Sequence, residues 1–371
     1  MAERAAARGL RVLVVERREH IAGNAYDFRD EHGILVHRYG PHIFHTNAPR
    51  VSGYLSRFTS WRPYEHRVLC AVDGQLVPMP LNRTTLNRLY GLRLNDEPAA
   101  QRYLARVAVP CEAPRTSRDA VLAKIGSDLY ERLFRGYTRK QWDLDPAELD
   151  ASVCARIPVR TDTDDRYFTD SFQNMPQDGY TAMFERILDH PLIEVRTGVA
   201  HAEPGDGGAR ARLLVWTGPI DAYFGHRLGA LPYRSLDFRF ETHELAGGGL
   251  LQAVGQINYP SLDVPFTRTT EFRHLTGQAS ARTTIAFEFP RAEGDPYYPI
   301  PRPENRELYR RYRALAGAER DVVFVGRLAR YQYLNMDQVV AQALLAARRS
   351  YGPAAPARRR TRAPREAVGV A

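Results

Sequence analysis

The chain opens with a helix, a glycine and a short apolar strand, and this order constrains the fold more than any other feature. Residues 2–9 (AERAAARG) favour helix and end on Gly9, where a glycine stops a helix. Residues 11–16 (RVLVVE) form an apolar run that ends in Glu16, as buried parallel strands do. The pattern is typical of the second half of a dinucleotide-binding βαβ unit, whose terminal acid accepts ribose hydroxyls. Taken alone, the run also fits any buried strand.

A second α/β segment lies near the other end of the sequence. Residues 322–325 (VVFV) predict a buried strand, and residues 337–349 predict an apolar helix. Between the two α/β segments the pattern is helical over 82–142, and alternating runs near 237–242, 251–259, 268–272 and 283–289 predict an antiparallel sheet. This order predicts a discontinuous α/β domain with two insertions, as in flavoproteins of the two-dinucleotide-binding type.

Three local features give further expectations. Thr46 or Asn47 is expected to cap a helix that runs to about Phe58. Asp73-Gly74 between apolar runs predicts the turn of a hairpin over 67–80. The aromatic run 167–172 predicts a strand.

Charge and cysteine content narrow the class of protein. The net charge of +9 comes from fifty arginines and only two lysines, and +6 of it lies after residue 347, so we expect no nucleic-acid partner. Three widely spaced cysteines cannot form a disulfide scaffold, which fits a reducing compartment and a cytoplasmic location. No apolar run reaches the roughly 18 residues of a membrane span.

Polar and aromatic side chains gather in a few segments that could hold a ligand. His42 and His45 lie in the loop YGPHIFHT, but no further ligand is spaced to complete a zinc site, so we expect no metal. Tyrosines offer a stacking face and a donor for phosphate or sugar oxygens, and arginines clamp a diphosphate with two parallel hydrogen bonds. The candidates are Tyr137, Tyr167, Tyr297, Tyr298, Tyr331, Tyr333, Arg156, Arg160 and Arg268. Each of them alone also fits an ordinary core or surface residue.

The sequence resembles the bacterial UDP-galactopyranose mutases, in family order over residues 2–349. The matching stretches include HIAGNAYD, YGPHIFHT, LFRGYTRKQW, RIPVRTDTDDRYF, FQNMPQDGYTAMFERIL, NYPSLDVPFTRTTEF, EGDPYYPIPRPEN and FVGRLARYQYLNMDQVVAQAL. The resemblance implies an FAD enzyme that interconverts UDP-galactopyranose and UDP-galactofuranose for cell-surface glycans. It works with reduced flavin, whose N5 attacks the anomeric carbon and expels UDP before the sugar ring recloses.

The resemblance also assigns roles to residues of this chain. Arg156 and Arg268 are implied to stabilise the diphosphate, with Arg156 in a mobile lid. Residues implied to contact substrate are Asn82, Phe134, Tyr137, Thr138, Trp142, Tyr167, Tyr298 and Tyr333. Residues implied on the flavin side are Glu16, Arg18, Asn24, His42, His45, Arg234, Arg327 and Asp337, with the helix 337–349 directing its N-terminus toward the flavin.

The resulting fold prediction is α/β, with a Rossmann-like FAD-binding domain, an inserted helical domain and an antiparallel β-sheet domain. The predicted ranges are 1–60, 185–232 and 318–352 for the FAD-binding domain, 82–150 for the helical domain, 61–81, 151–184 and 233–317 for the sheet domain, and 353–371 for a disordered arginine-rich tail. A homodimer is left open.

The chain departs from the family pattern at several positions. It lacks the first strand and the G-x-G-x-x-G turn, so we expect a truncated or misassigned start, with roughly fifteen to twenty residues missing. A chain that truly starts at Met1 is expected to bind FAD weakly or not at all. Ala22 replaces a usual glycine, Leu133 a usual phenylalanine and Asn335 a usual aspartate. The alternatives are an amine-oxidase-like flavin oxidoreductase and an inactive remnant.

Overall fold

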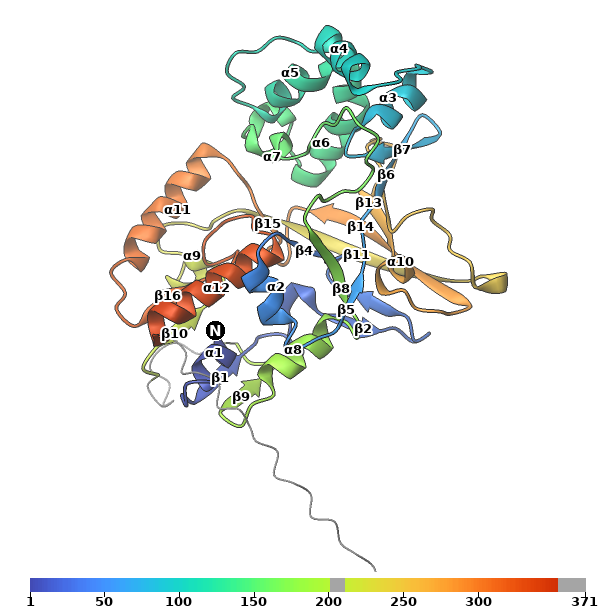
Figure 1. Ribbon diagram of the computed structural model, residues 1–371. Coiled ribbons are helices and arrows are strands. Elements are labelled where there is room, and N and C mark those ends of the chain that lie inside the picture. Colours follow the sequence, from blue (N-terminus) through green and yellow to red (C-terminus); the bar gives the residue numbers. More distant parts are fainter. Residues whose placement is uncertain (201–210, 353–371) are drawn as a thin grey trace, which may run out of the picture.

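The structure is a computed structural model that describes residues 1–200 and 211–352. Figure 1 shows a helical region at the top, a strand-rich region in the middle and on the right, and an α/β region at the left and bottom. The predicted tail over 353–371 lies outside the described residues. No described helix combines the length and the apolar character that crossing a bilayer requires.

The α/β region contains the strands that the ends of the sequence predicted. β1 (Val12–Val15) pairs in parallel with β9 (Ile193–Arg196), and β10 (Leu214–Trp216) pairs in parallel with β16 (Val322–Phe324). Within the described residues these remain two separate two-stranded sheets. The helices of this region are α1 (Ala2–Ala6), α8 (Tyr180–Leu188), α9 (Ile220–Tyr223), α11 (Pro303–Ala316) and α12 (Met336–Tyr351). α1 packs against α12 and β1, which joins the two ends of the described chain.

The helical region follows the predicted hairpin and shares its core with it. β6 (Val68–Val72) and β7 (Gln75–Met79) are joined at Asp73-Gly74, where both residues have positive φ, as the predicted turn requires. The helical elements are α3 (Arg83–Tyr90), α4 (Glu97–Val107), α5 (Ser117–Leu129), the π-helical turn η2 (Tyr130–Arg135), α6 (Gly136–Trp142), the short turn η3 (Pro146–Glu148) and α7 (Ser152–Ala155). One apolar core runs from the hairpin to Cys154 in α7.

A seven-stranded sheet occupies the middle of the molecule, in the order β15-β11-β14-β13-β12-β6-β7. Its remaining strands are β11 (Tyr233–Glu244), β12 (Gln256–Asn258), β13 (Arg268–Glu271), β14 (Arg282–Arg291) and β15 (Tyr298–Pro299). All pairs are antiparallel as predicted, except that β12 pairs with β6 in parallel. The hairpin β6–β7 thus extends this sheet into the helical region (Figure 1).

Smaller sheets link the central sheet to the α/β region. β2 (Asp27–Arg29) pairs with β3 (Leu35–His37), and β4 (Phe44–Thr46) and β5 (Trp61–Pro63) flank β8 (Phe172–Pro176). A one-turn helix η1 (Gly23–Ala25), a second short turn η4 (Ala246–Gly248), α2 (Pro49–Leu55) and α10 (Phe272–Thr276) complete the described elements.

Two local predictions are wrong. The predicted strand over 167–172 is a loop, and the strand begins at Phe172, because the backbone partners on β4 and β5 face residues 172–176. The cap of α2 is Ala48 instead of Thr46 or Asn47. Thr46 Oγ1 accepts from the Ala48 N–H at 3.0 Å, and Asn47 Oδ1 accepts from the Ser171 N–H at 2.8 Å, so both side chains are used to join loops.

Candidate active site

Two arginines and two tyrosines from separate elements form one cluster. Arg156 follows α7, and its guanidinium carbon lies 4.2 Å from the centre of the Tyr333 ring. Arg327 follows β16 and lies 4.7 Å from the same ring centre and 5.8 Å from that of Tyr298. The Tyr298 and Tyr333 rings are stacked with centres 5.9 Å apart. We call these four residues the arginine–tyrosine cluster.

The cluster is accessible and electropositive. Tyr333 exposes 44% of its surface and Arg156 is also exposed, so a ligand can reach both from solvent. Partial desolvation of its phenol would raise the pKa of Tyr333, but the guanidinium groups of Arg156 and Arg327 outweigh this effect and lower that pKa below its ordinary value. Burial and, to a smaller extent, the carboxylate of Glu288 raise the pKa of Tyr298 to about 12. Two cations with phenol donors suit an anion such as a diphosphate.

Arg268 is the first residue of β13, and its positive charge acts on the phenols of Tyr298 and Tyr333 in the cluster. Its Nε lies 3.2 Å from Glu288 Oε1, on the neighbouring strand β14 at the register position directly opposite. Both atoms are buried and neither has a hydrogen bond of good geometry, so the pair is held by charge alone. Burial raises the pKa of Glu288, although Arg268 opposes the shift. Sequence reasoning missed Glu288, because only the strand register places it opposite Arg268.

Four of the predicted substrate residues lie on η2 and α6: Phe134 is on η2, and Tyr137, Thr138 and Trp142 are on α6. Phe134 and Thr138 are buried in the core of the helical region, at 4% exposure each. Tyr137 lies with its ring centre 6.0 Å from the Arg268 guanidinium carbon, and Trp142 with its ring centre 6.1 Å from that of Tyr298. The structure therefore brings Tyr137 and Trp142 to the arginines and tyrosines.

Tyr167 and Asn82 occupy different surroundings. Tyr167 is half-buried, its N–H donates to His66 O at 2.7 Å, and its phenol lies within the field of Arg156 and Arg268. Asn82 is fully buried, where its Oδ1 accepts from the Thr85 N–H at 3.0 Å and its Nδ2 donates to Asp164 O at 3.1 Å. The Asn82 side chain thus caps α3 and is not part of the cluster.

The predicted flavin-side residues at the end of β1 form a connected group. Glu16 Oε1 accepts from the Arg18 N–H at 3.0 Å. The Arg18 guanidinium donates to Asn24 Oδ1 at 2.9 Å and Asp295 Oδ2 at 2.8 Å, and it stacks 4.1 Å from the Tyr39 ring centre. Arg18 therefore joins the carboxyl end of β1 to the loop before β15.

The remaining flavin-side predictions are more dispersed. His42 Nδ1 lies 2.9 Å from Gly40 O, and burial lowers the pKa of His42 to about 4, so the ring is neutral near pH 7. Asp337, in the first turn of α12, accepts from Thr46 Oγ1 at 3.0 Å. His45 instead stacks on Phe168 and lies 2.7 Å from Asp170.

Arg234 and Arg327, two further flavin-side predictions, donate hydrogen bonds to backbone carbonyls beside the site. Arg234 is buried, and its Nε donates to Gln141 O at 3.1 Å at the end of α6. Arg327 donates to Tyr297 O at 3.1 Å. Both arginines therefore fix the elements that carry Trp142 and Tyr298.

A dinucleotide fits this region only in part. At the carboxyl end of β16, Gly326 has φ of +98°, and a Cβ there would meet no atom within 4 Å. A Cβ at Gly23 would also meet no atom within 4 Å. Open space beside the backbone at strand ends is where dinucleotides bind in such folds. Glu16 and Arg18 at the end of β1 and Arg327 after β16 place polar side chains at these strand ends, whereas the sequence offers no G-x-G-x-x-G turn for a pyrophosphate.

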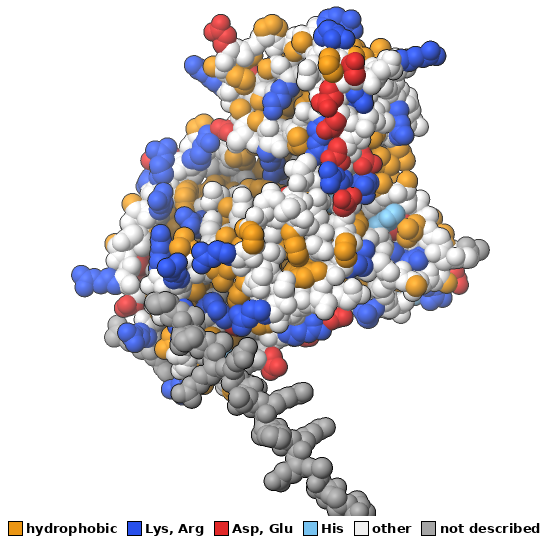
Figure 2. All heavy atoms as spheres, in the orientation of Figure 1, with side chains coloured by type: hydrophobic (Ala, Val, Ile, Leu, Met, Phe, Trp, Pro, Cys, Tyr) orange, Lys and Arg blue, Asp and Glu red, His pale blue; other side chains and the backbone are white. Residues whose placement is uncertain are grey.

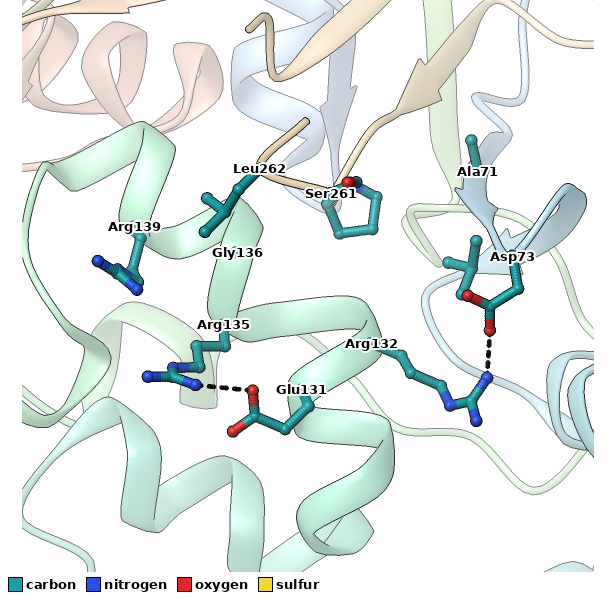
Figure 3. Close-up of a pocket in the computed structure, with 11 residues that line it drawn as sticks. Ala71, Asp73, Glu131, Arg132, Arg135, Gly136, Arg139, Ser261 and Leu262 are labelled. Atoms are coloured by element: carbon teal, nitrogen blue, oxygen red, sulfur yellow. Dashed lines mark hydrogen bonds and ion pairs between the residues drawn. The ribbon is translucent and has the colours of Figure 1, made fainter. Parts of the chain in front are cut away.

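Two cavities lie outside the arginine–tyrosine cluster. One of about 450 Å³ adjoins Tyr39, Asp295 and Tyr297, next to Arg18. The other, of about 250 Å³, lies between η2, α6, the hairpin and the loop at Ser261 (Figure 3). Figure 2 shows a deeper hollow between the helical region and the rest of the molecule. Among the described side chains, no three His, Cys, Asp or Glu are grouped to hold a metal.

Comparisons with known proteins identify relatives of this chain. Residues 132–333 match the family model described as UDP-galactopyranose mutase, and residues 1–58 match a NAD(P)-binding Rossmann-like domain. A Klebsiella pneumoniae protein described as a probable UDP-galactopyranose mutase is 38% identical over 93% of this chain and 89% of its own length. The dTDP-fucopyranose mutase of Escherichia coli is 35% identical over 90% of each chain.

A solved structure shares the fold. The crystal structure of a reduced UDP-galactopyranose mutase matches with a TM-score of 0.77 and 16% identity over 95% of this chain and 92% of that chain. The family model and the curated relatives together cover most of the sequence. The chain therefore belongs to the UDP-galactopyranose mutase family of flavoprotein isomerases, as the sequence resemblance predicted.

Proposed function

We propose that the protein interconverts UDP-galactopyranose and UDP-galactofuranose, with FAD in its reduced form as cofactor. The observation that carries this proposal is the arginine–tyrosine cluster. Two guanidinium groups lie within 5 Å of one phenol ring whose pKa they lower. Such a site stabilises a diphosphate better than it stabilises the neutral or cationic amine substrates of an oxidase.

The reaction breaks and remakes the bond between the anomeric carbon and the β-phosphate oxygen. When this bond breaks, the electron pair passes to the phosphate oxygen, and UDP gains negative charge. Arg156 and Arg268 stabilise that charge, and Tyr167, Tyr298 and Tyr333 donate hydroxyl hydrogen bonds to it. The same groups hold UDP nearby until it returns to the recyclised sugar, so no net oxidation occurs.

FAD supplies the nucleophilic N5 when it is bound in its reduced form. On the protein side, Glu16 would accept ribose hydroxyls, and Arg18, Asn24, Arg234, Arg327 and Asp337 would hold or support the cofactor. His42, with a pKa of about 4, would meet the ring as a neutral imidazole. His45 would also contact the cofactor.

The uridine end is assigned to α6 and its neighbours. Tyr137 and Trp142 offer faces for base stacking beside Arg268 and Tyr298. Phe134 and Thr138 shape the helix behind them from the core, and Asn82 fixes the start of α3. Arg156 is exposed after the short helix α7, and it would close over bound substrate as a lid.

The cysteines indicate the compartment in which the reaction would take place. Cys70, Cys111 and Cys154 are free thiols, which fits a reducing cytoplasm. The galactofuranose nucleotide would be used for cell-surface glycans. Gel filtration would test whether the protein forms a homodimer.

A second substrate follows from one relative. Because the chain is 35% identical to a dTDP-fucopyranose mutase, a dTDP-linked 6-deoxy sugar is the alternative. Supplying UDP-galactofuranose and dTDP-fucofuranose as separate and competing substrates distinguishes the two, and we expect UDP-galactofuranose to be converted faster.

One experiment tests the reaction class. The protein is incubated with excess FAD, its bound flavin is measured, and UDP-galactofuranose is added with and without dithionite. We expect conversion only after reduction, with no reductant consumed per turnover. A flavin-loaded protein that consumes an oxidant or reductant with each turnover would instead be an oxidoreductase.

A further inference from the structure

Lys140, on α6, is surrounded by backbone carbonyls of one loop. Its Nζ donates to Tyr259 O at 2.6 Å, Ser261 O at 2.8 Å, Val264 O at 2.9 Å and Phe266 O at 2.8 Å. An ammonium group has three donor hydrogens, so four carbonyl oxygens more than satisfy it. We call residues 259–267 the carbonyl loop. Its backbone carbonyls surround the Lys140 ammonium in the way that loop carbonyls surround a bound cation.

The carbonyl loop leads directly into Arg268. It connects β12 to β13, and Arg268 is the first residue of β13. The base of the loop is closed by the Tyr259 N–H, which donates to Thr267 O at 2.9 Å. Thr267 in turn donates from its N–H to Glu288 O at 2.9 Å. The curvature of the loop therefore sets where the strand carrying Arg268 begins, next to its partner Glu288.

The same helix face makes a second close contact with the loop. Gly136 lies one turn before Lys140, and a Cβ at Gly136 would come 2.2 Å from Pro260 O. Figure 3 shows Ser261 and Leu262 above the helix at Gly136. Only a glycine allows this approach, so Gly136 and Lys140 dock α6 on the carbonyl loop together. Tyr137, between them in sequence, is thereby held against Arg268.

Position 140 carries a lysine in a chain whose basic residues are almost all arginines. The sequence contains fifty arginines and two lysines, and the second lysine, Lys124, is on α5. A compact ammonium with rotatable donors can sit inside a ring of carbonyls, whereas the planar fork of a guanidinium matches two parallel acceptors. An arginine at position 140 would therefore keep the charge and lose the geometry.

We propose that Lys140 is a positioning residue, which shapes the carbonyl loop and docks α6 on it so that Arg268 faces the substrate diphosphate. The inference rests on the proposed function, because it assigns Arg268 to the diphosphate. It extends that function with a residue that acts from behind the site, through the backbone of the loop.

The test compares the binding of UDP and of uridine by calorimetry, with FAD present, because only UDP carries the diphosphate. For Lys140→Met we expect UDP affinity to fall about tenfold relative to uridine affinity, as loss of one charge-assisted interaction implies. Lys140→Arg should show the same selective loss. Arg139→Met is the matched control: it removes one charge from the neighbouring, exposed position and should keep the wild-type preference for UDP.

The outcomes are distinct. If Lys140→Met keeps the wild-type preference for UDP, or loses UDP and uridine binding equally, Lys140 does not position the diphosphate site and the inference is wrong. Rescue by Lys140→Arg would also contradict it, since charge alone would then suffice. If the wild-type protein itself binds uridine as tightly as UDP, the proposed diphosphate site fails, and the inference fails with it.

A second measurement needs no variant and remains decisive if the variants do not fold. Amine acetylation of the native protein, followed by mass spectrometry, compares the two lysines within one molecule. We expect Lys124, whose one described contact is with Ala155 O at 3.3 Å, to react at least about tenfold faster than the fully hydrogen-bonded Lys140. Equal rates in the native protein would show that the carbonyl loop does not enclose Lys140.

Discussion

At the residue scale, the site depends on how a few charges are arranged around phenols. Two guanidinium groups lie near the Tyr333 ring, at 4.2 Å for Arg156 and 4.7 Å for Arg327, and these residues come from elements far apart in the sequence. Positive charge favours the phenolate, so the pKa of Tyr333 is lowered in spite of the partial desolvation of its phenol. The free site is therefore tuned for a negatively charged ligand.

This arrangement predicts a titration. Arg156→Met removes one cation and should raise the pKa of Tyr333, which tyrosinate ultraviolet absorbance measures, with Tyr333→Phe to assign the signal. UDP needs the protonated phenol as a donor, so UDP affinity should fall as pH rises through the pKa of Tyr333, below the range of an ordinary tyrosine. An unchanged titration in Arg156→Met would contradict the contact.

Ala22 gives a second prediction at this scale. Its φ is +70°, which lies in the left-handed region that residues with a Cβ avoid. Ala22→Gly should therefore increase the free energy of unfolding by about 0.5–1 kcal/mol, since the relieved strain exceeds the added chain entropy. Denaturant titration checks this, with Ala25→Gly as the control, which should lower stability. A loss of stability in Ala22→Gly would contradict the backbone geometry.

At the element scale, helix caps decide how the helical region is anchored. Asn82 caps α3 and also binds Asp164 O, in full burial. Asn82→Ala should lower the free energy of unfolding by about 1–2 kcal/mol. Asp96→Ala, which removes the exposed cap of α4, should cost less. UDP calorimetry on Asn82→Ala separates the two roles: unchanged UDP affinity would confine Asn82 to the cap.

Elements with strong local signals could be predicted from the sequence, and elements decided by distant partners could not. The hairpin turn at Asp73-Gly74, β16 and α12 were predicted because turn residues and apolar period are local properties. The run 167–172 has strand-forming residues, yet Phe168 is used to stack on His45. Its strand begins later because β4 and β5, far away in sequence, set the pairing.

The site divides in the same way. The resemblance grouped Arg156 and Arg268 with Tyr167, Tyr298 and Tyr333. The structure places Arg156, Tyr298 and Tyr333 together with Arg327. Residues that act on the group from other strands or loops were missed. Glu288 became visible only through the register of β13 with β14, because no sequence spacing encodes a cross-strand neighbour.

At the scale of the whole molecule, buried histidines predict how stability depends on pH. Burial lowers the pKa of His37 to about 3, that of His66 to about 3 and that of His42 to about 4. The unfolded chain therefore binds more protons below its ordinary histidine pKa. Stability should fall as pH drops from 6.5 toward 4, by up to about 1.4 kcal/mol per pH unit for each histidine.

Denaturant midpoints measured across this range test the dependence. His66→Gln removes one of the three groups and should reduce the slope of unfolding free energy against pH. A stability that stays level between pH 6.5 and 4.5 would contradict the neutral, buried state of these rings.

The proposed active site exists only in the assembled molecule. Arg156 and Tyr137 come from the helical region, Arg268 and Tyr298 from the central sheet, and Arg327 and Tyr333 from the α/β region. Figure 1 shows these three regions meeting. α6 lies at the lower edge of the helical region, next to the junction, and Lys140 and Arg234 fix it there. Catalysis should therefore be sensitive to changes at this junction that leave each region folded.

The most direct test of the central claim is turnover by Arg268→Met. Flavin-loaded wild-type protein and Arg268→Met are each reduced with dithionite, and conversion of UDP-galactofuranose to UDP-galactopyranose is followed by chromatography. We expect conversion by the wild-type protein and a loss of at least about a hundredfold in the variant, with equal bound flavin. Wild-type protein that is loaded and reduced but inactive, or a variant that keeps wild-type turnover, would contradict the account.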